Sequence, residues 1–218
     1  MRKQVALPTP RAIAARLGGH LPPPGARIGL LGGSFNPAHE AHLQISRDAL
    51  RRLGLDEVWW LVSPLNPLKP ARGMAPLGAR LESANRMARH PRIRPSDLEE
   101  LLGTRYSLDT LRALRARFPR VTFVWLIGAD NLLGLDKWHC WQQILRETIV
   151  AVFDRPTYAL RALAGRAAQS FASYRIAERQ ARRLVFCRAP VWIFLYTRRN
   201  PLSATKIRSR KARAGADE

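Results

Sequence analysis

The stretch LLGGSFNPAHEAHL, residues 30–43, constrains the fold more than any other part of the chain. An apolar run stops at two glycines, and Pro37 then precedes two histidines, His39 and His42, that stand three residues apart. The pattern predicts a buried strand that ends at Leu31, a tight turn through the glycines, and a helix that begins near Pro37 or His39. A turn or a core helix needs no histidines, so we expect this corner to bind a ligand.

The predicted start of the helix favours an anionic ligand. First-turn N–H groups lack partners within a helix, and together they carry about half a positive charge. Imidazoles at positions i and i+3 share one face of the first turn, where both can donate hydrogen bonds to phosphate oxygens. A zinc pair is less favoured, because helical zinc ligands usually stand at i and i+4 with a third ligand nearby. The glycines can also be purely architectural, and the histidines two unrelated surface residues.

Short apolar runs alternate with helical stretches along the rest of the chain. The predicted strands are residues 27–31, 57–62, 121–127, 148–153 and 191–196, and the predicted helices are residues 40–53, 77–89, 107–117, 131–145 and 159–183. Prolines mark residues 63–76 as a loop. This order predicts an α/β fold, a Rossmann-like doubly wound parallel sheet with helices on both faces. Ligands of such sheets bind beyond the carboxyl ends of the strands.

The charge balance narrows the class of partner. Lys and Arg number 37 against 16 Asp and Glu, a net charge of +21, which favours polyanions such as nucleotides, nucleic acid or anionic lipid. No basic stripe interleaved with aromatic residues is present, so we expect no specific nucleic-acid binding. No apolar run reaches the roughly 18 residues that cross a membrane. With two cysteines and no signal-like segment, we expect no membrane association and a cytoplasmic location.

Composition also divides the chain into three parts. Residues 1–25 are rich in arginine and proline and end at LPPPG, which predicts a flexible extension. Residues 26–208 contain the predicted strands and helices and form the predicted main domain. Residues 209–218 form a short basic tail.

Six segments carry a resemblance to a known family. GGSFNPAHEAHL resembles the GGSFDPxHxGH signature of the HxGH nucleotidyltransferase superfamily, and five further segments resemble, in order, motifs of its bacterial nicotinate-nucleotide adenylyltransferases: NPLKP (66–70), RYSLDTL (105–111), LIGADNLLGLDKW (126–138), DRPTY (154–158) and LSATKIR (202–208). The first motif alone identifies the superfamily, and the later ones identify this member over residues 28–208.

The resemblance implies transfer of AMP from ATP to nicotinate mononucleotide, which gives deamido-NAD and pyrophosphate in NAD biosynthesis. The mononucleotide phosphate attacks the α-phosphorus of ATP in line, with Mg²⁺ bound to the ATP oxygens, so the enzyme supplies mainly positioning and charge stabilisation. On this resemblance His39 and His42 are catalytic and contact the ATP phosphates. The implied ATP-binding residues are Gly32, Gly33, Ser34, Phe35, Ser203, Thr205 and Arg208, and those for nicotinate mononucleotide are Lys69, Tyr106, Ser107, Asp130 and Trp138. No protein ligand for the metal is nominated.

Several of these residues have a structural alternative. Asp130 can cap a helix, Trp138 can belong to the core, and Ser203 can cap an ordinary C-terminal helix. Ser107 near a helix start favours a carboxylate ligand. Arg80 is a further candidate for binding a phosphate or a carboxylate.

The chain departs from the family pattern at four positions. Asn36 replaces an aspartate, Ala41 replaces the glycine of HxGH, Leu68 replaces a histidine, and Ala204 replaces a serine. The competing functions are a related adenylyltransferase that uses nicotinamide mononucleotide or phosphopantetheine and, from a different class, a basic nucleic-acid-binding protein.

Overall fold

The computed structural model describes residues 7–64, 73–155 and 157–196. Within these ranges seven strands form one sheet, and every neighbouring pair is parallel. Their order across the sheet is β3-β2-β1-β4-β5-β7-β6. The bounds are β1 Arg27–Gly33, β2 Glu57–Val62, β3 Ile93–Ser96, β4 Thr122–Gly128, β5 Ile149–Phe153, β6 Arg175–Ile176 and β7 Val191–Leu195.

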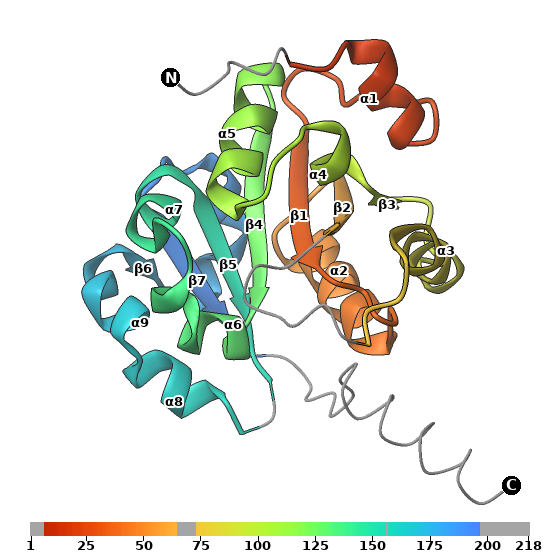
Figure 1. Cartoon of the computed structure of the whole chain (residues 1–218). Helices are drawn as coiled ribbons and strands as arrows, with labels where there is room; N and C mark the ends of the chain where they lie inside the picture. The colour runs from red at the N-terminus through yellow and green to blue at the C-terminus, as the bar shows by residue number, and fades with distance from the viewer. Residues whose placement is uncertain (1–6, 65–72, 156, 197–218) are drawn as a thin grey trace, which may run out of the picture.

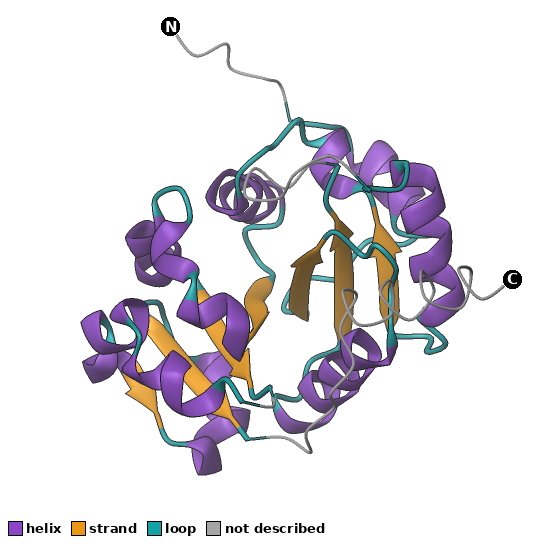
Figure 2. Ribbon diagram, turned by 60° about the horizontal axis from the view of Figure 1, so that its bottom comes forward, coloured by secondary structure: helices purple, strands orange, loops and turns teal. Residues whose placement is uncertain are grey.

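Helices cover both faces of the sheet, as predicted (Figures 1 and 2). The α-helices are α1 Pro10–Arg16, α2 Glu40–Arg52, α3 Leu77–Met87, α4 Leu98–Leu101, α5 Ser107–Arg117, α6 Ala129–Leu133, α7 Trp141–Glu147, α8 Ala159–Ala164 and α9 Arg166–Ser170, and the 3₁₀ segments are η1 Leu135–Lys137, η2 Ala172–Tyr174 and η3 Glu178–Phe186. One apolar core lies under α2, α3 and η3, and a second lies under α1 and α4 to α9. Alternate side chains of each central strand enter opposite cores, which explains why these strands are apolar throughout.

The order of strands reverses between β1 and β4. The chain leaves β1 through α2 toward β2 on one side, and it leaves β4 through α6 and α7 toward β5 on the other. The carboxyl ends of this central pair, Gly33 and Gly128, therefore border the crevice where open parallel sheets bind ligands.

Two predicted helices are interrupted. The helix predicted over 131–145 is divided into α6, η1 and α7, because Gly134 ends α6 and Cys140 takes a left-handed φ of +52°. The helix predicted over 159–183 breaks at Gly165, whose backbone is extended, and then gives way to short segments. Two short strands, β3 and β6, were not predicted.

The prediction that residues 1–25 are a flexible extension is wrong for its described part. Thr9 caps α1 by accepting a hydrogen bond from the N–H of Ala12 at 3.2 Å. Ile13 and Leu17 are fully buried in the same core as β1, and Arg16 pairs with Asp97. The apolar side chains in this segment recur at helical spacing, and that burial fixes it on the domain.

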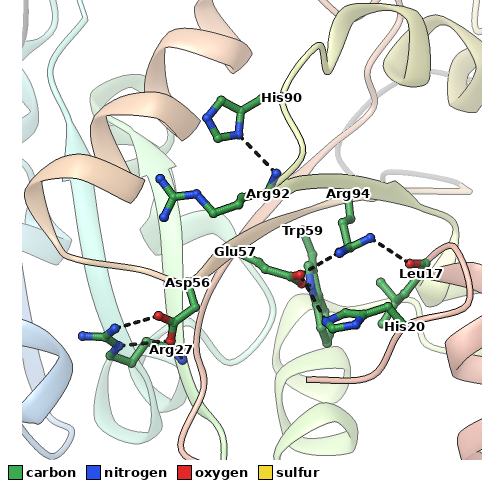
Figure 3. Close-up of polar contacts among 9 residues, drawn as sticks. All are labelled: Leu17, His20, Arg27, Asp56, Glu57, Trp59, His90, Arg92 and Arg94. Carbon is green, nitrogen blue, oxygen red and sulfur yellow. Dashed lines mark hydrogen bonds and ion pairs between the residues drawn. The ribbon is translucent and has the colours of Figure 1, made fainter. Parts of the chain in front are cut away.

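Polar contacts around Glu57, the first residue of β2, hold the end of this segment at the amino ends of the strands (Figure 3). The Glu57 carboxylate accepts from Trp59 Nε1 at 2.9 Å and from Arg94 Nε at 2.8 Å, and it lies 3.2 Å from His20 Nε2. Arg94 also donates to the carbonyl of Leu17 at 3.3 Å. In Figure 1 α1 lies at the top, whereas the strand arrowheads point downward, so this segment is far from the carboxyl ends of the strands.

No helix in the described parts of the chain combines the length and the apolar character needed to cross a membrane.

Candidate active site

The turn after β1 lies later in the chain than the two glycines suggest. Pairing with β2 continues through Gly32 and Gly33, opposite Leu61 and Val62, so β1 does not end at Leu31. The left-handed residue of the turn is Phe35, with φ +46°. The predicted turn through the glycines is therefore wrong.

Gly32 is required by packing in the core. A Cβ on Gly32 would lie 2.7 Å from Trp125 Cη2, because the indole packs directly against the backbone of β1. A Cβ on Gly33 would lie 3.4 Å from the ring of Phe35, an ordinary contact. The architectural interpretation thus applies to Gly32, whereas a side chain at position 33 would not clash with the core.

His39 and His42 come together at the start of α2, as the resemblance implies. Their rings are stacked, with centroids 3.8 Å apart and planes inclined by 26°. His39 is the N-cap residue, and its backbone N–H donates to His42 Nδ1 at 3.2 Å. The Phe35 ring lies 4.6 Å from that of His42 and 5.1 Å from that of Trp60, so the histidine pair packs against these aromatic rings.

The His39 imidazole is buried and neutral. Only 3% of the residue is exposed, and its Nδ1 has no hydrogen-bond partner within the described residues. Burial lowers the pKa of His39 to about 4, with a further contribution from the positive charge of Arg155. At neutral pH this ring can donate one hydrogen bond without a charge of its own.

Asp130 and Arg155 meet beside His39. Asp130 follows the carboxyl end of β4, and its Oδ2 lies 3.2 Å from Arg155 Nη1, which comes from the segment after β5. The side chains pack across Gly128, where a Cβ would clash with Asp130 Oδ1 and would lie 3.0 Å from Arg155 Nε. Asp130 Oδ1 is buried without a partner among the described residues, and Asp130 is not the N-cap of α6. Arg155 was not among the predicted site residues, although it lies in the DRPTY segment and just past a predicted strand.

Tyr106 and the segment after η1 form a second cluster. Tyr106, rather than Ser107, is the N-cap residue of α5, and it contributes no side-chain cap, so the first-turn N–H groups of α5 have no such acceptor. The Tyr106 ring lies 4.3 Å from that of His139. The neighbouring Trp138 is half-buried against the core that lies under α1 and α4 to α9. The structure thus brings residues 106–107 next to residues 138–139.

Asn36 ties the turn after β1 to residues 73–75. Its Nδ2 donates to the carbonyl of Gly73 at 2.9 Å, and its Oδ1 accepts from the N–H of Ala75 at 3.3 Å. An amide can donate and accept at once, whereas an ionised aspartate only accepts. The departure from the family pattern at this position therefore gains one hydrogen bond.

Arg80 does not face a ligand site. The side chain is buried, and its guanidinium donates to four backbone carbonyls, including that of Ser34 at 2.7 Å. The hypothesis that Arg80 binds a phosphate or a carboxylate is therefore not supported.

Four of the predicted site residues fall outside the described residues: Lys69, Ser203, Thr205 and Arg208. The departures Leu68 and Ala204 and the predicted tail at 209–218 fall outside them as well. Within the described residues, no group of three or more His, Cys, Asp or Glu side chains is arranged to hold a metal ion.

Comparison with known proteins gives consistent matches. The cytidylyltransferase-like family model matches residues 30–210. The probable nicotinate-nucleotide adenylyltransferase of Parvibaculum lavamentivorans is 51% identical over 187 residues, covering 86% of this chain and 93% of the relative. That of Methylorubrum extorquens is 51% identical over 184 residues, covering 84% of this chain and all of the relative.

A solved structure shares the fold. Plasmodium falciparum nicotinic acid mononucleotide adenylyltransferase, complexed with NaAD, superposes with a TM-score of 0.64 at 16% identity, covering 84% of this chain and 83% of the other.

Proposed function

The chain belongs to the nicotinate-nucleotide adenylyltransferases of the cytidylyltransferase-like family, and from this premise we propose that adenylyl transfer takes place where β1 and β4 end. A phosphate oxygen of nicotinate mononucleotide attacks the α-phosphorus of ATP. The bond from that phosphorus to the oxygen bridging to the β-phosphorus breaks, and pyrophosphate leaves with this oxygen. The observation that carries the proposal is the stacked pair of His39 and His42 at the start of α2, next to the reversal of strand order.

The histidines act as hydrogen-bond donors to the ATP phosphates. Negative charge accumulates on the departing pyrophosphate, and donors that are already in place stabilise it at little cost in reorganisation. Because His39 is neutral, its contribution is a directed N–H rather than a full charge. The start of α2 and the guanidinium of Arg155 supply positive potential beside it.

The turn after β1 forms the floor for ATP. The backbone of Gly33, Ser34 and Phe35 approaches the triphosphate, while Gly32 keeps the turn in place by packing on Trp125. Ser203, Thr205 and Arg208 belong to the segment that resembles the family's C-terminal ATP-binding motif, and they are proposed to bind the triphosphate.

The mononucleotide occupies the side of β4. Asp130 binds the nucleotide near its ribose or pyridine ring, Trp138 stacks on the electron-poor ring, and Lys69 binds a phosphate or a carboxylate. The open first turn of α5, at Tyr106 and Ser107, receives the nicotinate carboxylate, because N–H groups prefer an anion to a neutral carboxamide.

Mg²⁺ is proposed to enter as part of the substrate, bound to ATP oxygens and water. Mg²⁺ keeps several of its waters and often needs few protein ligands. The described residues contain no cluster suited to a protein-built cage.

The proposed catalytic domain is residues 26–208, preceded by a segment docked through α1. The proposed location is the cytoplasm, where NAD precursors and ATP are available and where the cysteines Cys140 and Cys187, free in the structure, would stay reduced.

The test compares acceptors at a fixed concentration of MgATP. Pyrophosphate release is measured with nicotinate mononucleotide, nicotinamide mononucleotide and phosphopantetheine. We expect release with the first and much slower release with the others. Comparable rates with nicotinamide mononucleotide would contradict the carboxylate site at α5, and release only with phosphopantetheine would contradict the substrate assignment.

A further inference from the structure

Arg80 lies at a junction of three segments that border the proposed site. Only 2% of Arg80 is exposed. It donates to the carbonyls of Ser34 and Ser63, each at 2.7 Å, of Ala75 at 2.8 Å and of Pro64 at 3.1 Å. One guanidinium from α3 thus joins the turn after β1, the end of β2 and the segment that leads into α3.

Ser63 connects this cation to a buried carboxyl group. Its hydroxyl donates to Glu99 Oε2, while its carbonyl accepts from Arg80. Glu99 lies on α4 with 7% of its surface exposed, and burial raises its pKa. Because no ion pair joins Glu99 to Arg80 in the described residues, a single serine separates two buried ionisable groups of opposite sign.

The other oxygen of Glu99 continues the network to the start of α5. The Thr110 hydroxyl lies 3.3 Å from Glu99 Oε1 and also 3.3 Å from the carbonyl of Tyr106. The Thr104 hydroxyl lies 2.7 Å from that of Thr110 and can donate to it when Thr110 donates elsewhere. The continuous chain of contacts runs from Ser34 through Arg80, Ser63, Glu99 and Thr110 to Tyr106.

We propose that the buried network Arg80–Ser63–Glu99–Thr110 fixes the distance between the two substrate subsites. One end holds the turn proposed to bind ATP, and the other holds the helix start proposed to bind the nicotinate carboxylate. The four side chains are positioning residues rather than catalytic ones. This inference rests on the proposed function, because the two ends are identified as subsites there.

The network acts on turnover more than on the binding of either substrate alone. Each subsite keeps its own contacts when the link between them loosens. The attacking oxygen and the α-phosphorus then spend less time in line, and a misplacement of about 1 Å can cost about a hundredfold in rate. Loss of the link therefore lowers kcat with little change in either KM.

The experiment uses substitutions that remove one hydroxyl and keep the charges. Removing Arg80 or Glu99 would leave the other as a buried charge and risk unfolding. We instead compare Ser63→Ala and Thr110→Val in the full chain. The matched controls are Ser96→Ala and Thr148→Val, because both hydroxyls are buried and have no hydrogen-bond partner within the described residues.

The expected result is a kcat about tenfold lower for Ser63→Ala and for Thr110→Val, with either KM changed by about twofold or less. The controls should keep the wild-type kcat. Both substitutions act on the same carboxyl group, so the double variant should lose less than the product of the two single losses. Unfolding curves for every variant exclude a loss of folded protein as the cause.

Amide hydrogen exchange gives a second readout that does not need turnover. Thr110→Val should speed exchange at residues 33–36 as well as at 104–108, whereas Thr148→Val should not. Wild-type kcat in both network variants, or unchanged protection at residues 33–36, would overturn the proposal. Failure of the proposed function is distinguishable, because it would appear as absent turnover in the wild-type protein while the exchange comparison still decides on the network.

Discussion

The backbone N–H of His39 donates to Nδ1 of His42 at 3.2 Å. Nδ1 must accept in this bond, so in the neutral form of the His42 ring the proton is on Nε2. The N-cap residue thus fixes the tautomer of the histidine three positions later, and the two rings are stacked. Both rings of the HEAH segment are oriented before any substrate binds.

The protonation of His39 can be measured directly by NMR. Burial lowers its pKa to about 4 from 6.5, with a contribution from Arg155. The unfolded chain binds this proton near pH 6.5 and the folded chain only near pH 4, so stability from this group is complete above 6.5. This contribution of His39 to the free energy of unfolding, about 3 kcal/mol, is lost as the pH falls from 6.5 toward 4. Arg155→Gln should raise the measured pKa, and a His39 that titrates near 6.5 in the wild type would contradict its burial.

The two glycines of the turn should respond differently to alanine. Gly32→Ala places a Cβ 2.7 Å from the Trp125 ring, and overpacking of this kind costs about 1–3 kcal/mol. Gly33→Ala meets only an ordinary contact at 3.4 Å, so its unfolding free energy should stay within about 0.5 kcal/mol of wild type. If ATP approaches the backbone there, Gly33→Ala instead raises the KM for ATP. Denaturant unfolding and initial rates separate the two effects, and equal losses of stability would be inconsistent with this geometry.

The docked N-terminal segment should contribute to stability. Ile13 is fully buried, and truncation of such a side chain to alanine typically costs about 2–5 kcal/mol. Leu7→Ala is the control, because 44% of Leu7 is exposed. Urea unfolding should show a lower midpoint for Ile13→Ala alone. Identical midpoints for the two variants would restore the original expectation of a flexible extension.

The central strands could be predicted from the sequence, because burial on both faces makes them uniformly apolar. The edge strand β3 could not, since residues 93–96 read IRPS and include a proline. The order of strand, turn and helix around the proposed catalytic corner was predictable from one motif, although the turn lies at Phe35 rather than at the glycines.

Contacts between segments that are far apart in the sequence could not be predicted from sequence patterns. Arginine often binds anionic ligands, but the hydrogen-bond partners of Arg80 include carbonyls 17 and 46 positions away. Arg155 approaches Asp130 across 25 positions because β4 and β5 are neighbours in the sheet. In each case the tertiary fold decides what the charged side chain does.

The most direct test of the proposed catalytic corner is the turnover number of His42→Ala with saturating MgATP and nicotinate mononucleotide. Loss of a donor already in place for the leaving phosphates should lower kcat by about 10²–10³. His90→Ala is the matched control and should keep the wild-type rate. His90 precedes β3 at the amino ends of the parallel strands, where its Nδ1 accepts from the N–H of Arg92 (Figure 3), whereas the proposed site lies at their carboxyl ends. A folded His42→Ala enzyme with wild-type kcat would contradict the assignment of adenylyl transfer to this corner.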